Sequence, residues 1–333
     1  MIGKGDVVLV TGATGFTGSV LVRKLCELGA DVRAIARQTS RREHLADLPI
    51  DWLLADVYDA EVAEPAARSA DYIFHVAAAY RSPGIGEEIY RKVHVDSTQL
   101  LARAARGPAS RLKRFVHFST VGVHGHIDHP PADEDAPFKP GDIYQETKAE
   151  AELWIREFAE AEDLPLTVIR PAAILGPGDM RLLKLFKMAA LPAVPLIGKT
   201  RGMYHLIHVD DLVGFSIYVA DHPDTLGEVY ICGNEEPTSI REIIETVAEW
   251  SGKSPSFFRI PAAPVFWIAA ACDRLCRSIG VSPPIYPRRV AFFTKDRAFD
   301  TTKMHSVDGY QQLFTNATGL RDTYDGYRVQ ELI

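Results

Sequence analysis

The feature that most constrains the fold is a run of three evenly spaced glycines near the start of the chain. In TGATGFTG, Gly12, Gly15 and Gly18 lie between a β-branched run, residues 7–10, and an amphipathic helical pattern that ends at Gly29. Such glycines permit a tight strand-to-helix turn and let the backbone approach an anionic group, which the free N–H groups of the helix start then bind. The G-x-x-G-x-x-G spacing differs from the commonest G-x-G-x-x-G form, but its place between strand and helix is the context of a dinucleotide-binding turn.

Short β-branched runs alternate with helix-length segments through the first half of the chain. This alternation predicts right-handed crossovers and a parallel sheet covered by helices on both faces. The predicted fold class is therefore α/β, a Rossmann-type doubly wound parallel sheet with a smaller, discontinuous C-terminal lobe. The predicted strands are residues 7–12, 31–37, 51–56, 72–78, 114–120, 166–172 and 228–233.

The rhythm of strands and helices loosens after residue 173, where prolines become frequent. At 333 residues the chain exceeds the usual size of one domain, so a large domain with a smaller lobe is expected. We assign residues 1–173, together with about 206–235, to the dinucleotide-binding domain. Residues from about 174–205 and 236–333 are assigned to a lobe that binds the substrate.

Composition excludes several classes of function. The 37 Lys and Arg residues against 44 Asp and Glu residues give a net charge of −7, and no basic stripe is present, so nucleic acid is not expected as a partner. None of the four cysteines forms a C-x-x-C pair, which argues against a disulfide framework or a zinc site. No secretory signal precedes the first predicted strand. These features together predict a cytoplasmic protein.

An apolar run without charges, APVFWIAAAC at residues 263–272, complicates this description. It has about half the length that a membrane-spanning helix needs, so no transmembrane segment is predicted. We expect a buried helix or one that contacts another subunit. The alternative is an interfacial helix that makes peripheral contact with lipid or admits an apolar substrate.

The end of the second predicted strand indicates which dinucleotide fits. NAD-preferring sites commonly place an acidic residue there, whereas this chain has Ala36 followed by Arg37. A cation at this place favours the 2′-phosphate of NADP(H), and NAD(H) remains the alternative. Arg41 and Arg42 either add to this attraction or are solvated surface. Asp56, after the third strand, is expected either to accept from the adenine amino group or to cap the next turn.

Tyr144 and Lys148 lie one helical turn apart in IYQETK, residues 143–148. Asp142 is a predicted N-cap, and Gln145 completes a capping-box pattern, which places Tyr144 in the first turn of a helix. A phenol has an ordinary pKa of about 10. Lys148, the helix N-terminus and an oxidised nicotinamide all favour the phenolate and so lower that pKa, which suits a proton shuttle for a carbinol.

These motifs together resemble those of the extended short-chain dehydrogenases/reductases, in the NAD-dependent epimerase/dehydratase superfamily. TGATGFTG, HVAA, FSTVGVHG, YQETK, RPAAILGPGD and HLIHVDDL occur in family order over nearly the whole chain. The resemblance implies that Tyr144 is the acid/base, that Lys148 binds the nicotinamide ribose and tunes Tyr144, and that Thr120 fixes the substrate oxygen. Ser119 is the weaker candidate for the role of Thr120, and its alternative role is a hydrogen bond to the backbone. The expected cofactor-binding residues are Gly12, Thr14, Gly15, Phe16, Thr17, Gly18, Arg37, Asp56, Val57, Val76, Ala77, Ala78, Tyr144, Lys148, Pro171, Ala172 and Ile174.

Departures from family patterns narrow the expected activity. Val121 and Gly122 follow Thr120 where the sugar-nucleotide 4,6-dehydratases carry an Asp-Glu pair, and Ala173 stands where sugar-nucleotide epimerases typically have asparagine. The pattern is closer to the branch of 3β-hydroxysteroid dehydrogenase and dihydroflavonol reductase. We therefore expect an NADP(H)-dependent oxidoreductase that interconverts a secondary alcohol and a ketone on a bulky, fairly apolar small molecule.

Two alternative functions stay open: a sugar-nucleotide epimerase with tightly bound NAD, and a dinucleotide-binding regulator without turnover. Many relatives pair through the helices beside the tyrosine, so a homodimer is a further expectation. His94 stands where the family commonly has asparagine, and we expect it to replace a structural hydrogen bond. The histidine-rich segment HGHIDH, residues 124–129, is expected to face the substrate, and no metal site is expected there.

Overall fold

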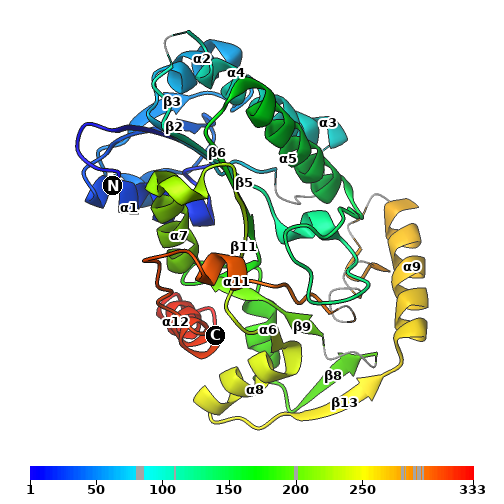
Figure 1. The fold of residues 1–333 in the computed structure, drawn as a ribbon. Coiled ribbons are helices and arrows are strands. Elements are labelled where there is room, and N and C mark those ends of the chain that lie inside the picture. Colours follow the sequence, from blue (N-terminus) through cyan, green and yellow to red (C-terminus); the bar gives the residue numbers. More distant parts are fainter. Residues whose placement is uncertain are drawn as a thin grey trace.

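The fold is built on one parallel sheet (Figure 1). A computed structural model describes residues 1–79, 86–108, 110–198, 202–278, 281, 283–287, 290, 294 and 296–333. The seven strands follow the order β11-β6-β5-β4-β1-β2-β3, and every pairing is parallel. The strands are β1 Val7–Thr11, β2 Asp31–Ala36, β3 Asp51–Leu54, β4 Tyr72–His75, β5 Arg114–Phe118, β6 Leu166–Pro171 and β11 Val229–Cys232.

The predicted α/β class and all seven predicted strands are thereby confirmed. Each strand ends one to three residues earlier than the apolar run that predicted it, because the last residues of each run form the turn beyond the strand. The 72–78 run shows this most clearly, since β4 stops at His75 and the HVAA segment continues as loop.

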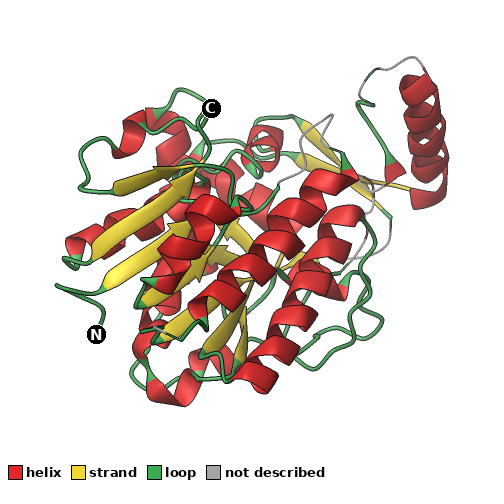
Figure 2. Cartoon of the chain, turned by 90° about the horizontal axis from the view of Figure 1, so that it is seen from above, coloured by secondary structure: helices red, strands yellow, loops and turns green. Residues whose placement is uncertain are grey.

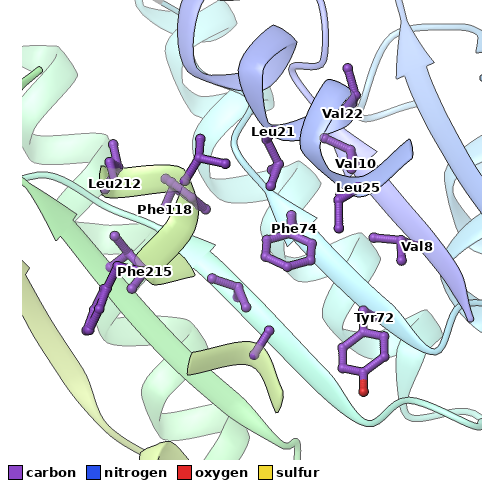
Figure 3. Close-up of a cluster of buried hydrophobic side chains, with 14 of the residues drawn as sticks. Val8, Val10, Leu21, Val22, Leu25, Tyr72, Phe74, Phe118, Leu212 and Phe215 are labelled. Atoms are coloured by element: carbon purple, nitrogen blue, oxygen red, sulfur yellow. The ribbon is translucent and has the colours of Figure 1, made fainter. Parts of the chain in front are cut away.

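Helices cover both faces of the sheet, as the alternating pattern requires. On one face α1 (Phe16–Glu27) and α7 (Val209–Asp221) pack against side chains of β1, β4 and β5, and Figure 3 shows this cluster, with Phe74 near its centre. On the other face lie α2 (Ala60–Arg68), α4 (Ser97–Ala105) and α5 (Ile143–Glu162). The short helix α3 (Glu87–Arg91) continues through a π-helical turn, Lys92–Asp96, into α4.

A third apolar cluster lies beyond the sheet, mostly in the segments assigned from the sequence to the substrate lobe, although it includes Leu206 of the segment assigned to the dinucleotide-binding domain. Its small two-stranded sheets were missed in the sequence because their strands are short and, in β8, interrupted by Pro195. The division into two lobes stays a prediction. The elements here are β7 Ala173–Leu175, α6 Leu183–Met188, β8 Ala193–Ile197, β9 Met203–Tyr204, β10 Leu206–His208, β12 Thr238–Ser239, α8 Ile240–Trp250, β13 Ser256–Ile260, α9 Ala262–Ser278, α11 Thr302–His305 and α12 Asn316–Val329.

The apolar run at residues 263–272 forms most of α9 but is not buried, so the expectation of a buried helix is wrong. Among the described side chains of α9 only Ala269 is buried, whereas Trp267 and Ile268 are exposed. Figure 1 shows α9 at the edge of the molecule. Within the described residues, no helix is long and apolar enough to cross a membrane.

A buried ion pair fastens α5 to β6. The Arg170 guanidinium and the Glu152 carboxylate are both fully buried, and Arg170 Nη2 lies 2.6 Å from Glu152 Oε1. Arg170 also donates to the Glu134 carbonyl at 2.7 Å, and its charge lies over the Phe138 ring. One residue therefore connects the strand, the helix and the loop that follows β5.

We predict that Glu152→Gln lowers the free energy of unfolding by about 3–5 kcal/mol, because the substitution leaves the Arg170 charge buried without its counter-charge. The matched control on the same helix is Glu150→Gln, which removes an exposed pair with Arg91 and is expected to change stability little. Urea unfolding of both variants measures the difference. Equal stability of the two variants would show that the buried pair does not hold the helix.

Candidate active site

The parallel sheet brings the turns assigned to the cofactor to a single edge. Because all strands run the same way, the residues that follow β1 through β6 lie at the carboxyl edge. The strand order reverses at β1, with β2 and β3 on one side and β4, β5 and β6 on the other. In open α/β sheets, ligands bind at the carboxyl edge beside such a reversal.

The glycine turn after β1 fits a pyrophosphate. Gly12 has φ of +75°, and a Cβ there would lie 2.8 Å from the backbone nitrogen of Ala77. A Cβ on Gly18 would lie 2.1 Å from the Gly12 oxygen. Helix α1 therefore packs against the turn more closely than any residue other than glycine at position 18 would allow. A Cβ on Gly15 would meet only that oxygen, which leaves the outer side of the turn open. No side chain caps the helix start at Phe16, so its first N–H groups can bind an anion.

A buried chain of hydrogen bonds fixes this turn against the end of β4. Ser97 donates to the Val93 carbonyl at 2.6 Å, so its oxygen accepts from His75 Nε2 at 3.2 Å. His75 Nδ1 then accepts from the Thr11 hydroxyl at 2.8 Å, and Thr11 accepts from the Ala77 N–H at 3.2 Å. Burial lowers the pKa of His75 to about 3, which keeps the ring neutral. This chain was not predicted from the sequence, although the polar residues Thr11 and His75 at the ends of two β-strands were a signal for it.

Two charged residues lie beyond β2 and β3, where the adenosine half of a dinucleotide is expected. Arg37 is exposed directly after β2, and no carboxylate in the described part of the chain pairs with it. Asp56 is likewise exposed after β3. Arg42 differs, because its guanidinium lies 5.8 Å from the centre of the Trp52 ring. Arg37 is therefore a cation available to a phosphate at this edge, and Arg41 is exposed as well.

The start of α5 places Tyr144 in the first helical turn. The Asp142 side chain accepts from the Gln145 N–H at 3.0 Å, which confirms the predicted N-cap. The capping box is not completed as predicted: the Gln145 side chain accepts from the Gly141 N–H at 2.8 Å, one residue before the cap. The hydrogen bonds at the start of α5 therefore also hold the loop that precedes the helix.

Lys148 extends from α5 to the end of β5. Its side chain is buried, and Nζ donates to the Phe118 carbonyl at 2.7 Å. Burial lowers the pKa of Lys148 to about 8, and the Glu152 carboxylate, one turn along the helix, opposes that shift. An ammonium has three donors, so two are left for other groups.

Thr120 lies two residues beyond Phe118 and begins a 3-10 helix, Val121–His124. Its hydroxyl oxygen accepts from the Gly122 N–H at 3.1 Å, so the hydroxyl proton can be donated elsewhere. Ser119 was expected to hold backbone as its alternative role. That expectation is wrong for the described residues, since its buried hydroxyl has no hydrogen-bond partner among them. An orphaned hydroxyl at this edge is compatible with a bound ligand.

His94 supports α5 from the π-helical turn. Its Nε2 accepts from the Ala79 N–H at 3.0 Å, so Nδ1 carries the proton and donates to Thr147 at 2.7 Å. The ring also contacts that of Tyr144 edge-on, with the centroids 5.3 Å apart. Burial lowers the pKa of His94 to about 2. The predicted structural hydrogen bond is confirmed, and the contact with Tyr144 goes beyond it.

The histidine-rich loop after β5 encloses a small pocket. Residues between 124 and 139 line a cavity of about 270 Å³. His126 and Lys139, which line this pocket, both pair with Asp128. Across the described residues no set of His, Cys, Asp and Glu side chains is arranged to hold a metal ion. That the loop faces a substrate stays a prediction.

The fold and the turns at its carboxyl edge define a Rossmann-type enzyme of the nicotinamide-dinucleotide class. A profile described as the NAD dependent epimerase/dehydratase family matches residues 8–233. The chain belongs to this family, and it is an NAD(P)-dependent oxidoreductase of the extended short-chain type. The resemblance drawn from the six motifs is thereby confirmed.

Relatives of known name cover almost the whole chain. A 3 beta-hydroxysteroid dehydrogenase/Delta 5-->4-isomerase from Mycobacterium tuberculosis is 30% identical, over 96% of this chain and 90% of the relative. A ceramide reductase from Caulobacter vibrioides is 26% identical, over 97% of this chain and 94% of the relative. The crystal structure of gox2253 superposes with a TM-score of 0.80 at 27% identity, over 99% of this chain and all of that one.

We predict that Lys148→Met stabilises the protein relative to the wild type most at neutral pH. Below about pH 8 the folded state holds a buried ammonium, whose pKa is lower than the ordinary value of about 10.4. As the pH rises through that range, the folded lysine loses its proton before the unfolded one, so the penalty for its burial fades. The relative stabilisation should therefore fall by about 3 kcal/mol between about pH 7 and pH 10.

Urea unfolding of the wild type and the variant across this pH range measures the effect. Every titrating group except Lys148 is present in both proteins, so the difference between their free energies of unfolding reports on Lys148. Lys24→Met is the control, since Lys24 is exposed and should show no such pH trend. A parallel pH trend in both variants would mean that Lys148 does not carry a buried charge.

Proposed function

We propose that the protein is an NADP(H)-dependent oxidoreductase that interconverts a secondary alcohol and a ketone on a bulky, fairly apolar small molecule. The observation that carries this proposal is the position of Lys148. It is a buried cation that donates to the carbonyl of Phe118, the last residue of β5, and it lies one helical turn from Tyr144. Thr120 follows Phe118 by two residues. This position of Lys148, beside the start of α5 and the end of β5, supports a joint role for Lys148, Tyr144 and Thr120 in carbinol chemistry.

Tyr144 is the proposed acid/base. Its phenol would have an ordinary pKa of about 10, and a neighbouring cation favours the phenolate. In the direction of reduction, the Tyr144 hydroxyl gives its proton to the carbonyl oxygen as that oxygen becomes the alcohol. In the direction of oxidation, the phenolate takes the proton from the alcohol.

Thr120 is proposed to hold the substrate oxygen. Because its own oxygen already accepts from the Gly122 N–H, its proton is oriented toward a different acceptor. Gly122 has little room for a side chain, since a Cβ there would lie 3.2 Å from the Thr120 hydroxyl oxygen. The residues beside Thr120 therefore restrict where that hydroxyl can point.

The chain offers a consistent set of contacts for the dinucleotide. The glycine turn would bind the pyrophosphate, residues 76–78 and 171–174 would border the nicotinamide half, and Lys148 would give its remaining donors to the ribose. When bound, the nicotinamide supplies or accepts the hydride at C4. Since the hydride and the Tyr144 proton together make up the two hydrogens of the alcohol, no further reactant is needed.

We infer a preference for NADP(H) from Arg37, and Arg37→Ala tests it. A charge-assisted hydrogen bond is worth about 1.5–3 kcal/mol, so the variant should bind NADPH about 10- to 100-fold more weakly and change much less toward NADH. Fluorescence titration with each cofactor measures both constants. Arg106→Ala, at the exposed end of α4, is the control and should alter neither. An equal loss for both cofactors would refute the role of the 2′-phosphate.

The proposed substrate class rests on two supports. The relatives named above act, by their names, on a steroid and a ceramide, both of which are bulky and largely apolar. Two stretches of the segment assigned to the substrate lobe, residues 182–199 and 254–267, are also largely apolar and offer no charge pattern that would select a sugar nucleotide. We further place the reaction in the reducing cytoplasm, which the free thiols of all four cysteines support.

Tyr144→Phe tests the reaction directly. We predict a loss of about 10²–10⁴-fold in kcat/KM, the usual contribution of a general acid/base, with a much smaller change in the binding of NADPH. NADPH absorbance followed with a panel of ketosteroids and oxidised ceramides measures it. Tyr90→Phe is the matched control, because Tyr90 also packs edge-on against His94, with ring centroids 5.9 Å apart, and should keep activity.

The alternative functions give different results in the same assay. A purified protein with bound NAD that interconverts sugar epimers without added cofactor would replace the proposal by an epimerase. Binding of NADPH with no turnover of any ketone would identify a dinucleotide-binding regulator. Equal rates for wild type and Tyr144→Phe would refute the role of the phenol.

A further inference from the structure

Helix α9 presents an apolar stripe to the outside of the molecule. Pro264, Trp267, Ile268, Ala271 and Leu275 follow helical spacing, and all five are exposed. Trp267 is 77% exposed, Ile268 62% and Leu275 65%. Side chains of this size are normally buried, and their alignment on one helix face distinguishes them from scattered surface residues.

The helix also stands apart from the rest of the structure. Figure 1 shows α9 at the edge, following β13, and Figure 2 shows from above that it lies clear of the sheet and of the helices that cover it. Phe258 on β13 is exposed as well. The apolar stripe therefore lies where a large, flat partner can reach it without obstruction by the sheet.

The charge around the stripe is opposite to that of the whole chain. From Ser256 to Ser278, over β13 and α9, the sequence contains Arg259, Arg274 and Arg277 against the single acid Asp273, which gives 3 − 1 = +2. The whole chain carries −7, so the remainder sums to −7 − 2 = −9. An acidic protein with one basic, apolar face is suited to an apolar partner with negative charge at its surface.

The length of α9 limits how that partner is met. Its 17 residues extend about 26 Å, short of the hydrocarbon thickness of a bilayer. Arg274 is exposed next to the stripe on the same helix. An amphipathic helix with a tryptophan on its apolar face and cations beside it typically lies in the plane of the headgroups.

We propose that α9 is a peripheral docking face for the surface of an anionic lipid bilayer. The apolar stripe enters the boundary between headgroups and acyl chains, and Arg274 beside it meets the anionic headgroups. Each cation near such a surface contributes about 1 kcal/mol. The proposal does not depend on the reaction, since it concerns a face that carries none of the residues assigned to catalysis.

Vesicle sedimentation tests the proposal with the full-length protein. Wild type should sediment with vesicles of phosphatidylcholine and phosphatidylserine, much less with phosphatidylcholine alone, and less again in high salt. The double variant Trp267→Ser/Ile268→Ser should bind at least about tenfold more weakly, because each large apolar side chain taken from lipid is worth more than one tenfold step. Arg274→Glu should weaken binding only to the anionic vesicles.

Leu313→Ser is the matched control, because Leu313 is 76% exposed but lies outside α9, and it should bind as wild type does. Circular dichroism and thermal unfolding confirm that each variant is folded. Three results would overturn the proposal: no binding of wild type to either vesicle, undiminished binding of the double variant, or equal losses for the control. A dimer in light scattering that the double variant abolishes, without vesicle binding, would instead assign the stripe to a second copy of the chain.

Discussion

The site depends on one interaction, the burial of the Lys148 ammonium against the last carbonyl of β5. A lysine loses hydration when it enters the protein interior, and the 2.7 Å hydrogen bond to Phe118 restores only part of it. Its pKa falls to about 8, so the group remains mostly charged at neutral pH at an energetic cost to the fold. That cost is consistent with a functional site, since a purely structural position is more stable with an apolar residue. In the proposed reaction, that charge would make the Tyr144 phenol suited to proton transfer.

Lys148 is one of several polar groups on a face where a parallel sheet is normally apolar. Thr11, His75 and His117 occupy paired positions on β1, β4 and β5, and Arg170 follows on β6. Three of these four side chains have hydrogen-bond partners. His117 has none within the described part of the chain, and burial drives its pKa far below the usual value, so its ring is neutral. These groups form a polar layer behind the site.

The fold and the central residues could be predicted because they depend on local patterns. The glycine turn, the Asp142 cap and the spacing of Tyr144 and Lys148 are all set within a few neighbouring residues. The hydrogen bonds of His75 and the pairing of Glu152 with Arg170 join segments far apart in sequence, and nothing in either segment reveals the partner.

The exposure of α9 was missed for a related reason. An apolar run of that length has the same composition whether it is buried or lies at a surface, and only the packing of its neighbours decides between the two. The small sheets near residues 193–260 were missed because their pairing is also set by tertiary contacts, as in β8 with β13.

The most direct test of the account is the ionisation of Tyr144 itself. The near-ultraviolet absorbance of tyrosinate, recorded against pH with oxidised NADP present, should show one phenol with a pKa well below the ordinary value of about 10. That step should be absent in a protein with phenylalanine at position 144, and it should move toward the ordinary value when Lys148 is replaced by methionine. Identical titration curves for all three proteins would contradict the claim that the buried ammonium activates the phenol.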